Sequence, residues 1–217
     1  MKEFGALFDL DGVLIDSERL YTQFYNRLGA EYGLEEDFAL KIKGSTIEKI
    51  LSTYFPAPED SAAALKQLNE FEANMEYPIC EGVIELLEEL RASGIPAVIV
   101  TSSSENKMER LYSQHPHLSD YFEAIITGSD VKRSKPDPEG YLLAAARINR
   151  RPEDCFVFED SLSGLQAGIA SGAVVVGLTT TLPEERLKGK AHLLIDSLAG
   201  FGVKNMLELH EKCVNKL

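Results

Sequence analysis

The sequence predicts an α/β fold with a mostly parallel β-sheet core and an inserted α-helical cap. Short apolar runs recur along the chain and are separated by segments with helical spacing, a pattern typical of parallel sheets covered by helices. Residues 18–77 interrupt this alternation, because they show helical spacing and contain no strand-like run. With 217 residues and a hydrophobic content of 44%, the chain is long and apolar enough to bury such a core.

Five apolar runs are predicted to form the strands of the sheet. Each is short and shows no polar alternation, as is typical of strands buried on both faces. The predicted strands are Phe4–Leu10, Ala97–Val100, Ala124–Ile126, Cys155–Phe158 and Val174–Leu178. The predicted core helices are Val83–Ala92, Pro138–Arg147, Ser163–Ser171 and Met206–Cys213. Strands and helices in this order predict a Rossmann-like sheet with helices on both faces.

The predicted cap covers residues 16–80, and residues 1–15 and 81–217 are assigned to the α/β core. Proline interrupts helices, so the stretch Pro56–Asp60 is expected to divide the cap into two helical halves. Turn residues where the chain leaves the cap, including Gly82, predict a hinge. We expect the cap to close over a bound substrate and to exclude bulk water.

The composition argues against several classes of partner. The formal net charge is −13 at pH 7, and a field of this sign repels nucleic acid and anionic lipid. No stretch approaches the roughly 18 apolar residues that a membrane span requires. The three cysteines lack CxxC spacing, which favours a reducing compartment over a disulfide framework or a zinc site. We therefore expect a cytoplasmic monomer without a nucleic-acid or membrane partner.

Polar side chains follow four of the predicted strands, near the point where each strand ends. In chain order they are Asp9 and Asp11, then Thr101, Ser102 and Ser103, then Lys135, then Glu159 and Asp160. Taken singly, each group could be a turn or a helix cap. The carboxyl ends of parallel strands meet at one edge of a sheet, where such folds bind ligands, so we expect these side chains to converge.

Carboxylates, hydroxyls and a lysine in one place suit phosphoryl transfer. Asp9 and Asp11 are two residues apart, so one carboxylate can attack while the other manages protons. The negative charge of the carboxylates and of a phosphate must be neutralised, which Mg²⁺ does with carboxylate ligands such as Asp160. Lys135 adds positive charge, and the Ser102 hydroxyl can hold a phosphoryl oxygen.

Four segments of the sequence together resemble the four motifs of the haloacid dehalogenase superfamily, in the same order. The segments are Asp9–Leu14, Thr101–Ser103, Ser134–Pro138 and Phe158–Ser161. The resemblance extends over essentially the whole chain and is strongest to the branch that contains β-phosphoglucomutases and small sugar-phosphate phosphatases. It implies hydrolysis of a small phosphorylated metabolite through an aspartyl-phosphate.

The resemblance also implies a role for each site residue. Asp9 is expected to be the nucleophile, and Asp11 to protonate the leaving group and then activate water. Ser102 and Lys135 are expected to stabilise the transferring phosphoryl group. The implied Mg²⁺ ligands are Asp9, Asp11 through its backbone carbonyl, and Asp160, with Glu159 as a further ligand or an indirect support. The implied phosphate- or substrate-binding residues are Ser103, Asn106 and Gly44.

Two departures from the mutase pattern favour a phosphatase. Ile47 stands where mutases carry an arginine that grips a second phosphate, so a distal phosphate would lose a bidentate partner. The segment Asn69–Glu76 is acidic where a basic residue is expected. Outside the cap, Glu105 stands where a lysine is usual. The alternatives are a β-phosphoglucomutase-type intramolecular phosphotransferase and a non-catalytic member that binds phosphorylated metabolites.

Overall fold

The computed structural model describes residues 3–42, 47–103 and 105–214. The chain divides into two compact units, of which the first comprises Met1–Asp16 with Pro78–Leu217 and the second Ser17–Tyr77. The second unit is therefore an insertion in the first. None of the described helices is both long enough and apolar enough to cross a membrane.

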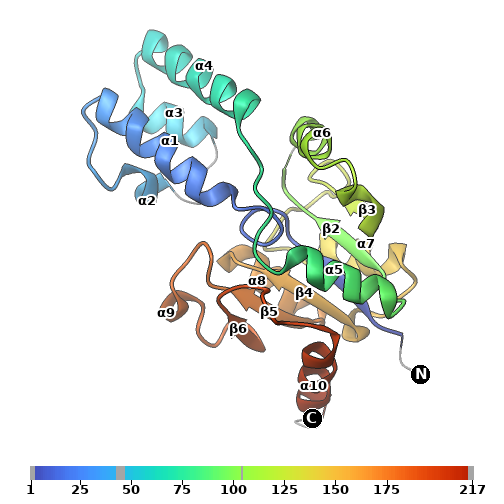
Figure 1. The fold of residues 1–217 in the computed structure, drawn as a ribbon. Coiled ribbons are helices and arrows are strands. Elements are labelled where there is room, and N and C mark those ends of the chain that lie inside the picture. The colour runs from blue at the N-terminus through green and yellow to red at the C-terminus, as the bar shows by residue number, and fades with distance from the viewer. Residues whose placement is uncertain (1–2, 43–46, 104, 215–217) are drawn as a thin grey trace. The chain divides into compact units, whose positions relative to one another are not determined.

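The first unit is built on a parallel sheet with the strand order β3-β2-β1-β4-β5-β6 (Figure 1). The strands are β1 (Gly5–Phe8), β2 (Ala97–Val100), β3 (Phe122–Ile126), β4 (Cys155–Glu159), β5 (Val174–Leu178) and β6 (Leu193–Ile195). Strand β1 pairs with β2 on one side and with β4 on the other. The strand order reverses beside β1, and crevices at such a switch point are where open α/β sheets bind ligands.

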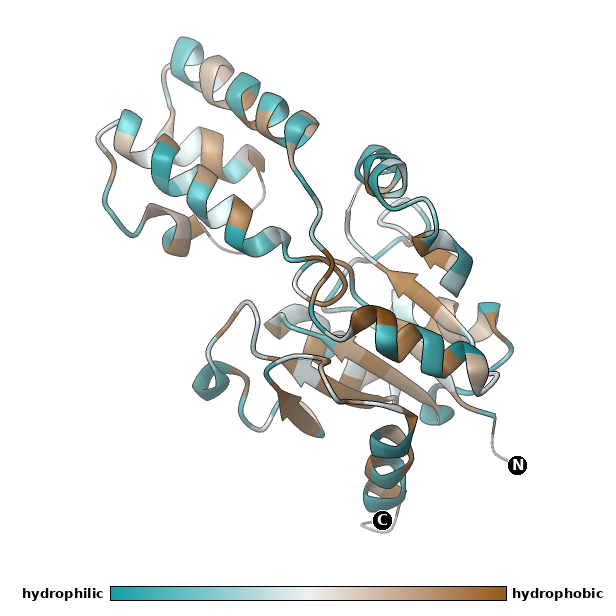
Figure 2. Ribbon diagram, viewed as in Figure 1, coloured by the Kyte–Doolittle hydropathy of each residue, from teal (hydrophilic) through white to brown (hydrophobic). Residues whose placement is uncertain are grey.

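Helices cover both faces of this sheet. Helices α7 (Glu139–Arg147) and α8 (Leu162–Ser171) contact the strands from one side. Helices α5 (Val83–Ala92) and α10 (Val203–Val214) contact each other, and α10 also contacts β5. The remaining short elements are α6 (Glu105–Gln114), α9 (Glu184–Leu187) and the 3-10 helices η1 (Leu118–Tyr121) and η2 (Pro152–Asp154). Figure 2 shows the strands as hydrophobic segments, as burial between helices requires.

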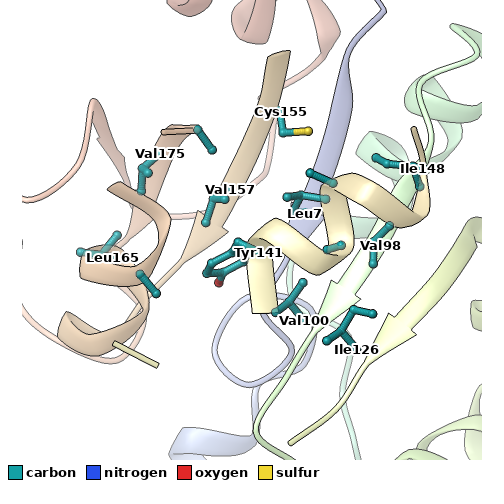
Figure 3. Packing of buried hydrophobic residues seen from close by; sticks show 14 of the residues in the cluster. Leu7, Val98, Val100, Ile126, Tyr141, Ile148, Cys155, Val157, Leu165 and Val175 are labelled. Carbon is teal, nitrogen blue, oxygen red and sulfur yellow. The ribbon is translucent and has the colours of Figure 1, made fainter. Parts of the chain in front are cut away.

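Side chains of alternate strand residues build the two halves of the core. Leu7 and Val157 belong to a buried cluster with Tyr141 of α7 and Leu165 of α8 (Figure 3). On alternate positions, Phe8 stacks on Phe158 with ring centroids 4.5 Å apart. Successive strand residues point to opposite faces, so both faces of the sheet are packed. This packing fixes the strand ends from which the polar side chains project.

The second unit is helical and has a core of its own. Its helices are α1 (Ser17–Glu31), α2 (Phe38–Ile42), α3 (Ile47–Tyr54) and α4 (Pro58–Asn74). Buried side chains from all four helices, among them Phe24, Phe38, Ile50 and Leu68, form one cluster. Helix α4 begins at Pro58, a favourable first position because its missing N–H would have no partner in the helix.

The two chain segments that connect the units are hydrogen-bonded to each other. The backbone N–H of Asp16 donates to the carbonyl of Pro78 over 2.9 Å, and that of Cys80 donates to Leu14 over 3.0 Å. Ile15 and Ile79 form an isolated antiparallel bridge. The chain therefore leaves the first unit and returns to it at one place.

The predicted α/β fold with a parallel sheet and a helical insertion is confirmed. All five predicted strands exist, although β1 is shorter than Phe4–Leu10 and β3 begins earlier than predicted, at Phe122. Strand β6 was not predicted. It has three residues, all half-buried, so its apolar run is too short to stand out.

Candidate active site

Asp9 and Lys135 form an ion pair at the carboxyl end of the central strand. Asp9 follows β1, and its backbone N–H donates to the carbonyl of Phe158 over 3.0 Å, which continues the pairing of β1 with β4. The Lys135 ammonium donates to Asp9 Oδ1 over 2.5 Å. Both side chains are largely buried, with exposed fractions of 13% for Asp9 and 12% for Lys135. The pair thus lies beside the paired ends of β1 and β4.

Glu159 holds Lys135 from the opposite side. Its Oε1 accepts hydrogen bonds from Lys135 Nζ over 2.6 Å and from the Tyr141 hydroxyl over 2.8 Å. Its Oε2 accepts from the backbone N–H groups of Asp160 and Ser161 and from the Ser161 hydroxyl. Glu159 is fully buried, and these five donors engage both of its oxygens. A buried carboxylate is stable only with such partners, so Glu159 acts here as an anchor for the lysine.

Gly164 makes room for the Glu159 carboxylate. It lies in the first turn of α8, and a Cβ atom at this position would overlap the carboxyl group of Glu159. Ser161 caps the same helix by accepting a hydrogen bond from the backbone N–H of Gly164 over 3.0 Å. The residues that begin α8 thus also hold Glu159, which in turn anchors Lys135.

The loop that carries Lys135 is braced by Glu139, the first residue of α7. The Glu139 carboxylate accepts hydrogen bonds from the backbone N–H groups of Lys132 and Arg133, over 2.9 and 3.2 Å. The Arg133 guanidinium also lies 3.1 Å from Asp137 Oδ2. Lys135 Nζ reaches the β2 carbonyl of Val100 over 3.0 Å. These bonds fix both ends of the lysine side chain.

Asp160 follows β4 and is buried, with an exposed fraction of 3%. Its Oδ2 accepts a hydrogen bond from the Thr181 hydroxyl, which lies in the loop after β5. One carboxylate oxygen of each of Asp9, Glu159 and Asp160 lies within 4.8 Å of the others. Carboxylates from β1 and β4 therefore share one small volume.

Asp11 has different partners from Asp9. Its Oδ2 accepts a hydrogen bond from the Ser103 hydroxyl over 2.8 Å, and its Oδ1 lies 2.5 Å from Lys107 Nζ on α6. The Ser103 backbone N–H in turn donates to the Thr101 hydroxyl over 2.9 Å. The ends of β1 and β2 are thereby linked through Asp11.

Burial and charge alter the proton affinity of Asp9 and Lys135 in opposite ways. Burial raises the pKa of Asp9 from 3.8 to about 7, against the attraction of Lys135 and with the help of the Glu159 charge. Burial lowers the pKa of Lys135, but the charges of Asp9 and Glu159 outweigh burial and place it above its ordinary value. The lysine is therefore charged at neutral pH, whereas a proton or another cation stabilises Asp9.

The donor set fits a divalent metal ion. Asp9, Asp11, Glu159 and Asp160 supply four carboxylates, and Lys107 and Lys135 are the lysines in contact with them among the described residues. With all six groups ionised, the carboxylates exceed the lysines by two charges. All of the available ligand atoms are oxygens, which hard cations prefer. Because Glu159 is saturated by its donors, Asp9 and Asp160 are better suited to binding a cation directly.

The structure brings together most of the residues predicted from the sequence. Asp9, Asp11, Lys135, Glu159 and Asp160 converge as described above, and Ser103 contacts Asp11. Two other predicted residues, Ser102 and Asn106, are exposed at the end of β2 and on α6. Gly44 lies outside the described residues, so the prediction for it stays a prediction.

Sequence reasoning missed three residues that hold the acidic groups, namely Lys107, Tyr141 and Thr181. Thr181 follows the predicted fifth strand, so the rule that strand ends converge, applied to that strand, would have found it. Lys107 lies two residues beyond Glu105, the position where a lysine was expected. Tyr141 lies within α7 and resembles any other buried aromatic residue in sequence.

The fold and the site together define an α/β enzyme with a carboxylate and a lysine at the carboxyl end of its central strand. The model of the haloacid dehalogenase-like hydrolase family matches residues 6–178. The chain belongs to this family.

Two similar curated proteins are named as phosphatases. A phosphorylated carbohydrates phosphatase of Thermotoga maritima is 35% identical over 90% of this chain and 88% of its own. Hexitol phosphatase A of Escherichia coli is 32% identical over 89% of this chain and 91% of its own. Among solved structures, a family IA, variant 3 HAD hydrolase of Entamoeba histolytica has a TM-score of 0.81 and 26% identity, and the match covers 96% of this chain and 99% of that one. The names of the relatives support phosphohydrolase activity.

Proposed function

We propose that the protein is a magnesium-dependent phosphatase that hydrolyses a small phosphomonoester through an aspartyl-phosphate on Asp9. The observation that carries the proposal is the Asp9 carboxylate at the end of β1, 2.5 Å from the buried Lys135 ammonium and beside Asp160. The lysine engages Oδ1, and the second carboxylate oxygen is the attacking atom. A positive charge next to both the nucleophile and the incoming phosphate lowers their repulsion.

The proposed reaction has two displacements at phosphorus. In the first, an Asp9 oxygen forms a bond to phosphorus, the bond to the leaving oxygen breaks, and Asp11 gives that oxygen a proton. In the second, Asp11 takes a proton from water, the water oxygen bonds to phosphorus, and the bond to Asp9 breaks. The products are an alcohol and inorganic phosphate, and both aspartates are regenerated. The positive charge of Lys135 stabilises the phosphoryl group in both steps, and the Ser102 hydroxyl donates to one of its oxygens.

We assign the metal to the acidic group at the ends of β1 and β4. Asp9 and Asp160 would hold Mg²⁺ through their carboxylates, and Asp11 through its backbone carbonyl. When bound, the ion supplies positive charge that offsets the phosphate and the surrounding carboxylates. We assign Glu159 to the support of Lys135, because its five hydrogen bonds already occupy both oxygens.

We propose that the substrate is a small sugar phosphate. The names of the Thermotoga and Escherichia relatives refer to phosphorylated carbohydrates and to hexitols. The mutase alternative is not favoured, since Ile47 replaces the arginine that would grip a second phosphate. The non-catalytic alternative does not account for the ion pair of Asp9 and Lys135, because binding alone requires no nucleophile. Ser103, Asn106 and Gly44 stay proposed as substrate contacts, and a cytoplasmic monomer stays a prediction.

A phosphate-release assay tests the proposal. Sugar phosphates, other phosphomonoesters, pyrophosphate and β-glucose 1-phosphate are incubated with the enzyme in Mg²⁺ or in EDTA. We expect free phosphate from sugar phosphates only with Mg²⁺, and a loss on the order of 10³-fold or more for Asp9→Asn. Asp120→Asn, an exposed aspartate of η1, is the matched control and should keep full activity. Undiminished hydrolysis by Asp9→Asn, or glucose 6-phosphate formed without free phosphate, would refute the proposal.

A further inference from the structure

Lys107 and Ser103 hold the Asp11 carboxylate between them. Lys107 Nζ lies 2.5 Å from Asp11 Oδ1, and the Ser103 hydroxyl lies 2.8 Å from Oδ2. The exposed fractions are 14% for the Lys107 side chain and 28% for that of Asp11. Each oxygen of Asp11 therefore has its own donor, in a partly buried setting where an ion pair is less screened than on the surface.

Both donors are themselves anchored to the core. The Ser103 backbone N–H donates to the Thr101 hydroxyl, and the Thr101 N–H donates to the β3 carbonyl of Ile126 over 2.9 Å. Lys107 precedes Met108 on α6, and Met108 is buried with an exposed fraction of 5%. The two donors thus come from different elements, and packing limits the movement of each.

Two fixed donors determine the orientation of a carboxylate. An aspartate side chain rotates about two bonds, and a single contact would leave the plane of its carboxylate free. Donors on both oxygens restrict both rotations. Proton transfer requires an oxygen of the acid to lie within hydrogen-bond reach of the reacting atom, so an oriented carboxyl group transfers the proton faster than a mobile one.

The two lysines of the site serve different aspartates. Lys135 contacts Asp9 and Glu159, whereas Lys107 contacts Asp11. Nothing in the reaction proposed above uses Lys107. We propose that Lys107, together with Ser103, is a positioning residue that orients Asp11 for proton transfer with the leaving group. This inference rests on the proposed function, because it requires Asp11 to be the proton donor.

The leaving group provides a readout that a merely structural role would not move. An alkyl phosphate expels a strongly basic alkoxide and needs a proton, whereas p-nitrophenyl phosphate expels a stable phenolate and does not. For Lys107→Ala we expect kcat/KM to fall about 10–100-fold with an alkyl sugar phosphate and at most about 3-fold with p-nitrophenyl phosphate. Most of the loss should lie in kcat, with KM little changed.

Three further variants complete the test. Lys107→Arg keeps the charge and the reach and should recover most of the alkyl phosphate activity, which also shows that the site tolerates substitution. Lys204→Ala removes an exposed helix lysine, paired with Glu208 at 3.9 Å, and is the matched control. In the Asp11→Asn background, Lys107→Ala should lower kcat/KM by no more than about 2-fold, because residues that act through one another are not additive.

Distinct results separate the inference from the proposed function. An equal loss of kcat/KM with both substrates, a rise in KM as the main effect, or full additivity with Asp11→Asn would refute the positioning role of Lys107. If Asp11→Asn shows the dependence on the leaving group and Lys107→Ala does not, only the inference fails. If Asp11→Asn slows neither substrate, Asp11 is not the acid, and both the proposed mechanism and the inference fail.

Discussion

Replacing Tyr141 by phenylalanine tests the hydrogen-bond network behind Lys135. The Tyr141 side chain is 1% exposed and Glu159 is fully buried, and the hydroxyl donates to Glu159 Oε1 over 2.8 Å. Figure 3 shows the tyrosine on α7, within the cluster that joins this helix to the sheet. Phenylalanine keeps the ring, so the change removes a hydroxyl and leaves the apolar packing intact.

The expected effect follows from the charge of the acceptor. A hydrogen bond to a charged group contributes about 1.5–3 kcal/mol, more than one between neutral groups. Glu159 keeps four of its five donors, so a loss of about 2 kcal/mol in the free energy of unfolding is expected, rather than the larger loss of a bare buried charge. For a chain of this length this corresponds to a fall of about 4–8 °C in Tm.

Tyr112 of α6 provides a control of opposite sign. Among the described residues, its hydroxyl is the buried side-chain polar atom without a hydrogen-bond partner. Tyr112→Phe removes a polar group that gains nothing in the folded state, so the free energy of unfolding should stay unchanged or rise by up to about 1 kcal/mol. Both variants are compared with the parent protein by thermal and urea unfolding followed by circular dichroism. Equal shifts for the two variants would show that the bond from Tyr141 to Glu159 contributes no stability.

Three further predictions concern stability. In EDTA, the free energy of unfolding of Asp9→Asn should equal that of the parent near pH 4 and exceed it increasingly as the pH rises to about 7, by at most roughly 4 kcal/mol. The reason is that the pKa of Asp9 is raised in the folded parent, so neutral Asp9 stabilises the fold at low pH and this stabilisation is lost as the pH rises through the window. A difference in urea unfolding that stays constant across this range would contradict the prediction. Gly82→Ala should lower the free energy of unfolding by about 2–4 kcal/mol, since φ is +82° and the Cβ atom would meet the backbone of a neighbouring loop. Gly94→Ala, with φ of +67° and open space around the Cβ atom, should lower it by only about 1 kcal/mol. Similar unfolding midpoints for the two variants would be evidence against steric overlap at Gly82. Gly164→Ala should lower both Tm and phosphate release by displacing the Glu159 carboxylate, and normal activity would show that this group need not be fixed.

The strand ends could be predicted because two physical rules coincide at them. A run such as Cys155–Phe158 is apolar on both faces only if helices cover both sides, and parallel pairing then places Asp9 and Asp160 at one edge. The order of the strands does not follow from this pattern. It became visible only in the structure, where β1 lies between β2 and β4 and gives Asp9 its neighbours.

The supporting contacts could not be predicted because they depend on side-chain direction. Lys107 reaches Asp11 only because α6 packs with Met108 and Leu111 against the core, which no spacing in the sequence specifies. Tyr141 is an apolar position in any periodicity analysis, yet its hydroxyl reaches Glu159. Pattern reasoning identifies residues that project from strand ends, whereas the groups that hold them come from helices and later loops.

The backbone hydrogen bonds between residues 14–16 and residues 78–80 affect which changes of sequence the fold can tolerate. The ends of the insertion are joined by two backbone hydrogen bonds, and the entropic cost of closing a chain segment rises only with the logarithm of its length. Ser17–Tyr77 can therefore be lengthened, shortened or exchanged as a cassette without disturbing the strands. Evolution and protein engineering can alter this module while the residues at the strand ends stay in place.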